Sequence, residues 1–395
     1  MAAGSRSKFQ QLAITHAAMM GGEAAMIVAL ADSFFFDVDP SGARSKVLAF
    51  LLVSFTPFLV VAPFIGPVID RVRGGRRFVV QAVAAARIVV QLLMIRFSDD
   101  TPLFGLVFVA LVLQKTYQVS KSALVPAVVR TDRELVEANS KLGLIAGLAG
   151  VVAVLPAALL QAVIGSAATL AYSAALFVVA LVSSLRLPRE LALRPDAPSA
   201  ASREALTPSV QLAWAAMLIL RAAAGFMLFL LAFEFRGRDD DGNVLLGAAI
   251  LLSSLGTMAG NALAPSIRGS LHEERMIGLA LGLPALAGLA AAATGGDRAG
   301  IALAFVVGFS AALCRLSFES IVQRDGPAAN RGQAFARFET QFQFGWVVAA
   351  VLPVLLPMPG RVGYLMVGAV MVAALVSYIT GVRTDEAVAR RVTRR

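Results

Sequence analysis

The chain has 395 residues, of which 58% are hydrophobic and 15% are charged, and its mean hydropathy is +0.77. A soluble domain carries about 25% charged residues, so this composition excludes that class and indicates an integral membrane protein. The net charge of +10 would suggest nucleic-acid binding in a soluble protein, but the basic residues here lie in short loops and at the termini, as membrane orientation requires. We therefore expect the lipid bilayer, and no nucleic acid, as a partner.

Twelve stretches of the chain are apolar enough to cross a bilayer, which takes roughly 20 residues each. In chain order they are Gln11 to Phe35, Lys46 to Ile65, Phe78 to Ile95, Pro102 to Leu124, Glu137 to Ile164, Ala167 to Leu185, Val210 to Phe233, Val244 to Ile267, Arg275 to Ala293, Gly300 to Val322, Phe338 to Leu356 and Val362 to Val382. The predicted fold class is therefore an all-α membrane protein with twelve transmembrane helices.

A proline-containing segment, residues 187–209, separates the sixth stretch from the seventh. Proline interrupts helices, so we predict a cytoplasmic linker there, between an N-terminal bundle at 1–186 and a C-terminal bundle at 210–395 with a short basic tail. The fragment Val151 to Pro156 is echoed about 200 residues later by Val348 to Pro353. Internal repeats of this kind are typical of transporters, so the two six-helix bundles are predicted to be pseudo-symmetric.

The charges of the loops alternate between the two sides of the membrane. One set of loops is basic and holds Arg6, Arg71, Arg73, Arg130, Arg189, Arg268, Arg324 and Arg383. The alternate set holds Asp37, Asp39, Asp99, Asp100, Asp239 and Asp297. Basic loops remain in the cytoplasm, so we predict that both termini are cytoplasmic. The expected location is a bacterial-type cytoplasmic membrane, with the chain as a monomer.

The loop between the second and third stretches carries a recognisable motif. It reads Gly66-Pro67-Val68-Ile69-Asp70-Arg71-Val72-Arg73-Gly74-Gly75-Arg76-Arg77. It resembles the signature between helices two and three of the major facilitator superfamily, usually Asp-Arg-x-Gly-Arg-Arg, with two residues inserted. The resemblance implies a transporter whose two six-helix halves alternate between outward-open and inward-open states.

We expect this loop to be a conformational latch made of Gly66, Asp70, Arg71, Arg76 and Arg77. Gly66 permits close backbone approach, and Asp70 can face a helix N-terminus or an arginine. The alternative is a plain cytoplasmic anchor. The corresponding loop of the second half, residues 264–269, lacks the Asp-Arg pair, so the latch is expected mostly in the first half.

A second, narrower resemblance concerns the end of the fourth stretch and the start of the fifth. Ser122-Ala123-Leu124-Val125-Pro126, followed by Glu134-Leu135-Val136-Glu137-Ala138-Asn139, is similar to a segment of the enterobactin-exporter and lysophospholipid-transporter branch. The Gly-Pro-x-x-Gly-Gly signature of many drug exporters is absent from the fifth stretch. The resemblance implies that the chain belongs to this branch, and it says less about the substrate.

Charged residues inside membrane spans cost at least ~2.5–3.5 kcal/mol each, so they require a reason. The deep ones are mostly Glu23, Lys115, Arg221, Arg315 and Glu319, in the first, fourth, seventh and tenth stretches. The superfamily resemblance implies that these four helices line the central cavity. Their excess of one positive charge favours an anionic or zwitterionic amphiphile over a cationic drug.

Glu23 is the candidate for proton coupling. Two alternatives remain, a permanent ion pair with Arg221 and direct contact with substrate. Arg221 cannot release its proton, so it is interpreted as an anion anchor or counter-ion. His16 shares the helical face of Glu23 and is either a packing residue or a proton relay, whereas Asp32 points the opposite way near the outer end.

The remaining intramembrane charges have plainer interpretations. Arg315 and Glu319 can form an i,i+4 pair, and Lys115 either binds an anion or extends to the membrane surface. Arg87 in the third stretch fits no cavity role, and it either extends to the membrane surface or pairs with another charge. Two histidines and one cysteine cannot build a usual metal site, and no nucleotide-binding loop or nucleophile constellation is present in the sequence.

These observations predict a secondary transporter rather than an enzyme or receptor. It would export a small amphiphilic or anionic molecule by alternating access, using the proton gradient and no cofactor. The alternative is a lipid or lysophospholipid flippase on the same fold.

Overall fold

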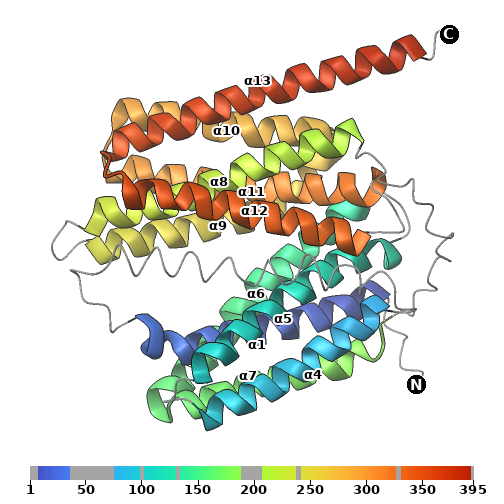
Figure 1. Cartoon of the computed structure of the whole chain (residues 1–395), viewed down its shortest axis with the longest axis vertical. Coiled ribbons are helices and arrows are strands. Elements are labelled where there is room, and N and C mark those ends of the chain that lie inside the picture. The colour runs from blue at the N-terminus through green and yellow to red at the C-terminus, as the bar shows by residue number, and fades with distance from the viewer. Residues whose placement is uncertain are drawn as a thin grey trace. The chain divides into compact units, whose positions relative to one another are not determined.

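A computed structural model of the chain describes residues 8–35, 75–97, 102–129, 134–187, 207–236, 242–325 and 331–392. Over these residues the protein is helical and contains no strand (Figure 1). The α-helices are α1 (Lys8–Phe35), α4 (Gly75–Arg96), α5 (Pro102–Leu124), α6 (Glu134–Val163), α7 (Ser166–Ser184), α8 (Pro208–Arg236), α9 (Gly242–Ser270), α10 (Glu273–Thr294), α11 (Asp297–Asp325), α12 (Arg331–Leu355) and α13 (Gly360–Val392).

Each predicted span that falls on described residues is a helix. Ten of the described helices are long and apolar enough to cross a membrane. The helix outside that set is α5, whose second half carries the polar run Gln114 to Gln118. The predicted second span, Lys46 to Ile65, and most of the predicted linker lie outside the described residues. The twelve-helix count, the division at residues 187–209 and the orientation of the termini therefore stay predictions.

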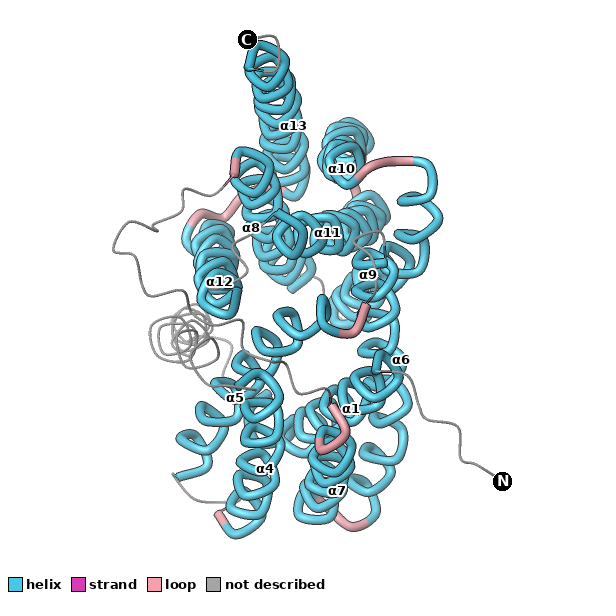
Figure 2. The backbone as a smooth tube through the Cα atoms, turned by 90° about the vertical axis from the view of Figure 1, so that its right-hand side faces the viewer, coloured by secondary structure: helices cyan, strands magenta, loops and turns pink. Residues whose placement is uncertain are grey.

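The chain divides into two compact units. The first holds α1, α4, α5, α6, α7 and the start of α12 up to Thr340. The second holds α8 to α11, α13 and the part of α12 from Gln341 onward. In the first unit α1 packs against both α6 and α7, and α4 packs against α5 and α7 (Figure 2). In the second unit α11 packs against α8, α9 and α10, and α10 also lies beside α13.

Glycines allow α9 and α11 to approach each other closely. A Cβ atom placed on Gly256 would lie 2.2 Å from the carbonyl oxygen of Phe305, and one on Gly260 would lie 2.6 Å from that of Phe309. On the facing helix, a Cβ on Gly308 would lie 2.2 Å from the carbonyl oxygen of Ser253. Small residues spaced four apart are a common way for membrane helices to bring their backbones together.

Gly256→Ala is therefore expected to force α9 and α11 apart and to destabilise the second unit by roughly 1–3 kcal/mol, as overpacking does. The matched control is Gly247→Ala on the same helix, where an added Cβ would meet nothing within 4 Å. The control should be neutral or slightly stabilising, since alanine favours helix by about 1 kcal/mol. The measurement is the melting temperature of each variant in detergent. Equal melting temperatures would contradict the close contact.

Candidate functional site

The centre of the first unit holds a buried ion pair between Glu23 of α1 and Arg87 of α4. The Arg87 side chain is fully buried and Glu23 is 6% exposed. One guanidinium nitrogen of Arg87, Nη2, donates to Oε2 of Glu23. The other, Nη1, donates to the carbonyl oxygen of Ala110 on α5 at 2.9 Å. The guanidinium also lies 4.5 Å from the ring centroid of Phe177 on α7.

Arg87 thus joins four helices through one planar group. The fork of a guanidinium can donate in two directions at once and stack on an aromatic face, which an ammonium cannot reproduce. Its Nε has no hydrogen-bond partner, and neither has the side-chain amide of Gln91, one turn further along α4, among the described residues. Gln91 is fully buried, so the polar region of this core extends beyond the ion pair.

Sequence reasoning named Arg221 as the ion-pair candidate for Glu23, and it left open whether Arg87 extends to the membrane surface or pairs, with no partner named. The structure gives that role to Arg87, which belongs to the same unit as Glu23. The sequence offered one signal for this pairing, which was the depth of Arg87 in the membrane. Arg87 lies twelve residues into α4, about 18 Å along the helix. At that depth its side chain is far from the membrane surface, so extension to the surface is disfavoured. A charge at that depth requires a carboxylate partner.

Two other predicted residues lie in the same unit. His16 is buried, and its Nδ1 lies 2.9 Å from the hydroxyl oxygen of Tyr117 on α5. The two rings are stacked, with centroids 5.8 Å apart. Lys115 is half-buried on α5 and adds a weaker electrostatic attraction to Glu23 than Arg87 does. Sequence reasoning did not find Tyr117, because nothing in the pattern places it beside His16.

The predicted latch is described only at its end. Gly66, Asp70 and Arg71 lie outside the described residues, as does the side chain of Arg76. Arg77, in the first turn of α4, donates from Nη2 to the carbonyl oxygen of Leu185 at 2.5 Å. Gln81 donates to the carbonyl oxygen of Ser184 at 3.2 Å. Both side chains therefore satisfy carbonyl groups at the C-terminal end of α7, where a positive charge is favourable.

The predicted charges of the second unit lie on α8 and α11. Arg315 and Glu319 form the expected i,i+4 pair, with Nε and Oε1 3.0 Å apart. Glu319 is buried, whereas the Arg315 side chain is 34% exposed. Arg221 is half-buried near the middle of α8. Asp32 lies in α1, and its side chain is outside the described set.

A second charge cluster, centred on Glu273, lies in the second unit. Glu273 is 1% exposed in the first turn of α10. It accepts hydrogen bonds from Nε of Arg268 at 2.9 Å, from Nη1 of Arg324 at 3.2 Å and from Oγ of Ser320 at 3.2 Å. Arg324 also contacts Glu274 at 3.0 Å and Asp325 at 2.8 Å. The cluster joins the ends of α9, α10 and α11.

The second half thus has a charge cluster of its own beside the corresponding loop, while the expectation of a latch mostly in the first half stays a prediction. The first loop places an acid, Asp70, before the basic residues that begin α4. The second places Arg268 before Glu273 and Glu274, which begin α10. The charges are therefore present in reversed order. A search for an Asp-Arg pair misses them, although opposite charges attract in either order.

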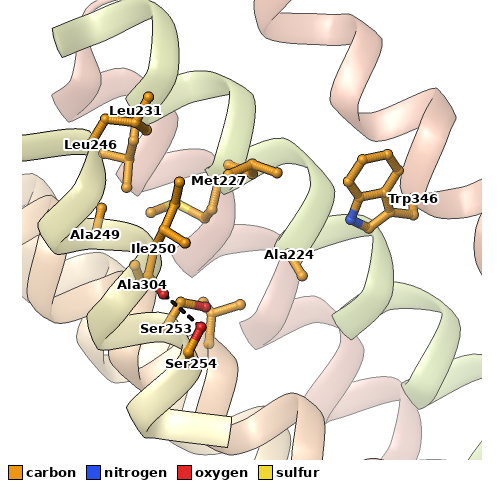
Figure 3. A pocket seen from close by; sticks show the side chains of 12 residues that line it. Ala224, Met227, Leu231, Leu246, Ala249, Ile250, Ser253, Ser254, Ala304 and Trp346 are labelled. Atoms are coloured by element: carbon orange, nitrogen blue, oxygen red, sulfur yellow. Dashed lines mark hydrogen bonds between the residues drawn. The ribbon is translucent and has the colours of Figure 1, made fainter. Parts of the chain in front are cut away.

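The second unit also contains a cavity of about 250 Å³, lined by residues of α8, α9, α11 and α12 (Figure 3). Its wall includes Met227, Leu231, Ile250, Ala304 and Trp346. The lining carries no charged side chain among the described residues. A site with these walls can accommodate an apolar group.

Comparison with known proteins decides the family. The model of the Major Facilitator Superfamily matches residues 12–350. The chain belongs to the Major Facilitator Superfamily. An uncharacterized protein of Mycobacterium leprae (strain TN), ML2143, is 27% identical over 404 residues, which cover 92% of this chain and 69% of that protein. This membership makes the chain a multi-pass membrane protein of a transporter family.

Solved structures of other transporters share the fold. A bacterial homologue of the iron transporter ferroportin, in an outward-facing state, has a TM-score of 0.74 at 15% identity, covering 96% of this chain and all of that one. The transporter FucP, in an outward conformation, has a TM-score of 0.75 at 11% identity, covering 95% and 99%. At this level of identity the likeness establishes the superfamily fold, and the substrate has to be argued from the residues of this chain.

Proposed function

We propose that the protein is a secondary active transporter that exports a small amphiphilic or anionic molecule by alternating access, coupled to the proton gradient. The observation that carries the proposal is the buried pair of Glu23 and Arg87. Within this pair only the carboxyl group can exchange a proton, because the guanidinium remains protonated. No other cofactor is part of the proposal.

Protonation of Glu23 would have a structural consequence. The ionised carboxylate holds α1 to α4 through Arg87, and Arg87 is in turn held by α5. A protonated carboxyl no longer neutralises the guanidinium, so a positive charge would remain uncompensated in the core. The contact between α1 and α4 would then weaken. This is a means by which proton uptake in the first unit can favour one transport state over the other.

The sequence supports the proposed location, orientation and motion of the protein. The protein would lie in a bacterial-type cytoplasmic membrane as a monomer, with both termini in the cytoplasm. Its two six-helix bundles would rock about the linker at residues 187–209, and the loop from Gly66 to Arg77 would latch the outward-open state.

The test is transport in proteoliposomes, with radiolabelled octanesulfonate as an anionic amphiphile that stays ionised. Flux in the native protein is expected to follow an imposed pH gradient, and flux in Glu23→Gln is expected to become independent of it. Glu137→Gln is the matched control, because its carboxylate is 49% exposed and pairs with Lys141 at the surface. Gradient-driven flux that survives intact in Glu23→Gln would remove Glu23 as the coupling group.

A lipid or lysophospholipid flippase is the second candidate. It is favoured by the resemblance of residues 122–126 and 134–139 to the lysophospholipid-transporter branch. In this segment Val125–Ala127 forms a 3-10 turn after α5, and Asn139 is buried in α6. A fluorescent lysophospholipid in the same proteoliposomes distinguishes the candidates. A flippase would move the lysophospholipid without a pH gradient and would not move octanesulfonate.

A further inference from the structure

The wall of the cavity in the second unit is mostly apolar. Its described polar lining residues are Ser253 and Ser254, which are adjacent on α9. The Ser254 hydroxyl donates to the carbonyl oxygen of Ile250 at 2.9 Å, so it is turned back onto its own helix (Figure 3). A polar head group placed in such a cavity would lose more hydrogen bonds to water than the few polar groups of the wall can replace, which is costly. An alkyl group would not.

Arg221 does not line the cavity, but it precedes the lining part of α8 by about one turn. Arg221 precedes Ala224 by three residues and Leu228 by seven, and both of these line the cavity. Residues with this spacing share a face of the helix, and three residues rise about 4.5 Å along its axis. Leu228 and Leu231 extend the apolar wall in the other direction. The α8 face therefore changes from cationic to apolar within one turn.

Arg315, the other predicted cavity arginine of this unit, lies further away. Arg315 shares a face of α11 with Ala304, but it follows Ala304 by eleven residues, about 16 Å along the axis. Of these two arginines, Arg221 is the one within one helical turn of the cavity wall. It is therefore the candidate to meet a head group whose tail fills the cavity.

We propose that this cavity holds the alkyl tail of a single-chain anionic amphiphile whose head group binds Arg221. The proposal rests on the proposed transport function, since it assigns the substrate class of the same protein. An apolar cavity of about 150 Å³ binds the six carbons of benzene, so one of about 250 Å³ has room for a short alkyl chain. The tail that fits is therefore short, about six to eight carbons, and the head group is a sulfonate, phosphate or carboxylate.

The test is binding, measured by the fluorescence of Trp346 in lipid nanodiscs. The chain has two tryptophans, so Trp214→Phe leaves Trp346, which lines the cavity, as the reporter. Alkanesulfonates of four, six, eight, ten and sixteen carbons are titrated. Affinity is expected to rise about threefold to fourfold per methylene up to about eight carbons and then to level off. A rise that continues to sixteen carbons, or none at all, would overturn the short-tail site.

Head-group charge is tested with octyl phosphate and octyltrimethylammonium. The anions are expected to bind and the cation to bind at least tenfold more weakly. Arg221→Gln should abolish this preference while keeping the dependence on tail length, and Arg221→Lys should restore it. Equal binding of anion and cation by the native protein would contradict the role of Arg221.

The cavity itself is tested by filling it. Ala304→Leu, in the cavity wall, is expected to weaken octanesulfonate binding at least tenfold, whereas Ala302→Leu, exposed on the same helix, should not. Equal effects of the two substitutions would exclude this cavity as the tail site. The assay needs no pH gradient, so binding that is retained in Glu23→Gln separates this proposal from the proposal of proton coupling.

Discussion

Replacing Arg87 by alanine is expected to destabilise the protein by about 3–5 kcal/mol, because it leaves a buried carboxylate without its partner. The substitution removes the bond to Glu23, the bond to the Ala110 carbonyl and the contact with the Phe177 ring together. The measurement is the free energy of unfolding in detergent, or the melting temperature where unfolding is irreversible. Arg87→Lys should recover only part of the loss, because an ammonium cannot reproduce the two-way fork.

A double variant, Glu23→Gln with Arg87→Met, shows why Arg87→Ala loses stability. Both charges are then gone and a side chain of similar length fills the space, so most of the lost stability should return. Recovery in the double variant would show that the loss in Arg87→Ala arises from an unpaired charge. If the double variant is as unstable as Arg87→Ala, the loss of stability comes from the missing packing of the Arg87 side chain and its contact with the Phe177 ring. The unpaired charge of Glu23 would then not be its cause.

Hydrophobicity predicted the helices because the bilayer sets their length. The stretch predicted as Ala167 to Leu185 is α7, Ser166–Ser184, and the one predicted as Arg275 to Ala293 is α10, Glu273–Thr294. A segment must be apolar over roughly 20 residues to cross, and its backbone must then bond within itself, so composition alone specifies a helix. The family followed from the loop that ends at Arg77, whose motif is local in sequence.

Contacts between helices could not be predicted in the same way. Glu23 meets Arg87 because α1 and α4 both pack against α7, and the hydropathy of a helix does not say how it is rotated about its axis. The same holds for His16 and Tyr117, which lie 101 residues apart in the chain. The pair of Arg315 and Glu319 was predictable, because i,i+4 neighbours meet on any helix.

The Glu273 cluster shows how a search for a motif can miss the physics behind it. Its members are Arg268, Glu273, Glu274, Ser320, Arg324 and Asp325. In the first half an acid is followed by an arginine, and the corresponding loop of the second half, residues 264–269, contains only Arg268. Five residues later Glu273 completes the contact. Arg268 in the last turn of α9 meets Glu273 at the start of α10 because the short turn between the two helices brings these ends together.

Glu273→Ala is expected to cost about 3–5 kcal/mol of stability, because Glu273 is buried and has three hydrogen-bond donors. Its removal leaves the guanidinium of Arg268 without this carboxylate, and Arg324 without one of its acidic partners. The ends of α9, α10 and α11 lose their common contact. The unfolding free energy in detergent measures the effect, and proteolysis near residues 265–275 should increase in parallel.

Glu274→Ala is the matched control, since the two residues are neighbours in the first turn of α10. The Glu274 side chain is 34% exposed, and its partner Arg324 also pairs with Glu273 and Asp325. Its loss should therefore cost no more than about 1 kcal/mol, as for surface ion pairs. Both carboxylates lie in the first turn of α10, where the helix dipole favours a negative charge. Equal losses from the two substitutions would mean that this dipole, and not the buried contacts of Glu273, stabilises the cluster.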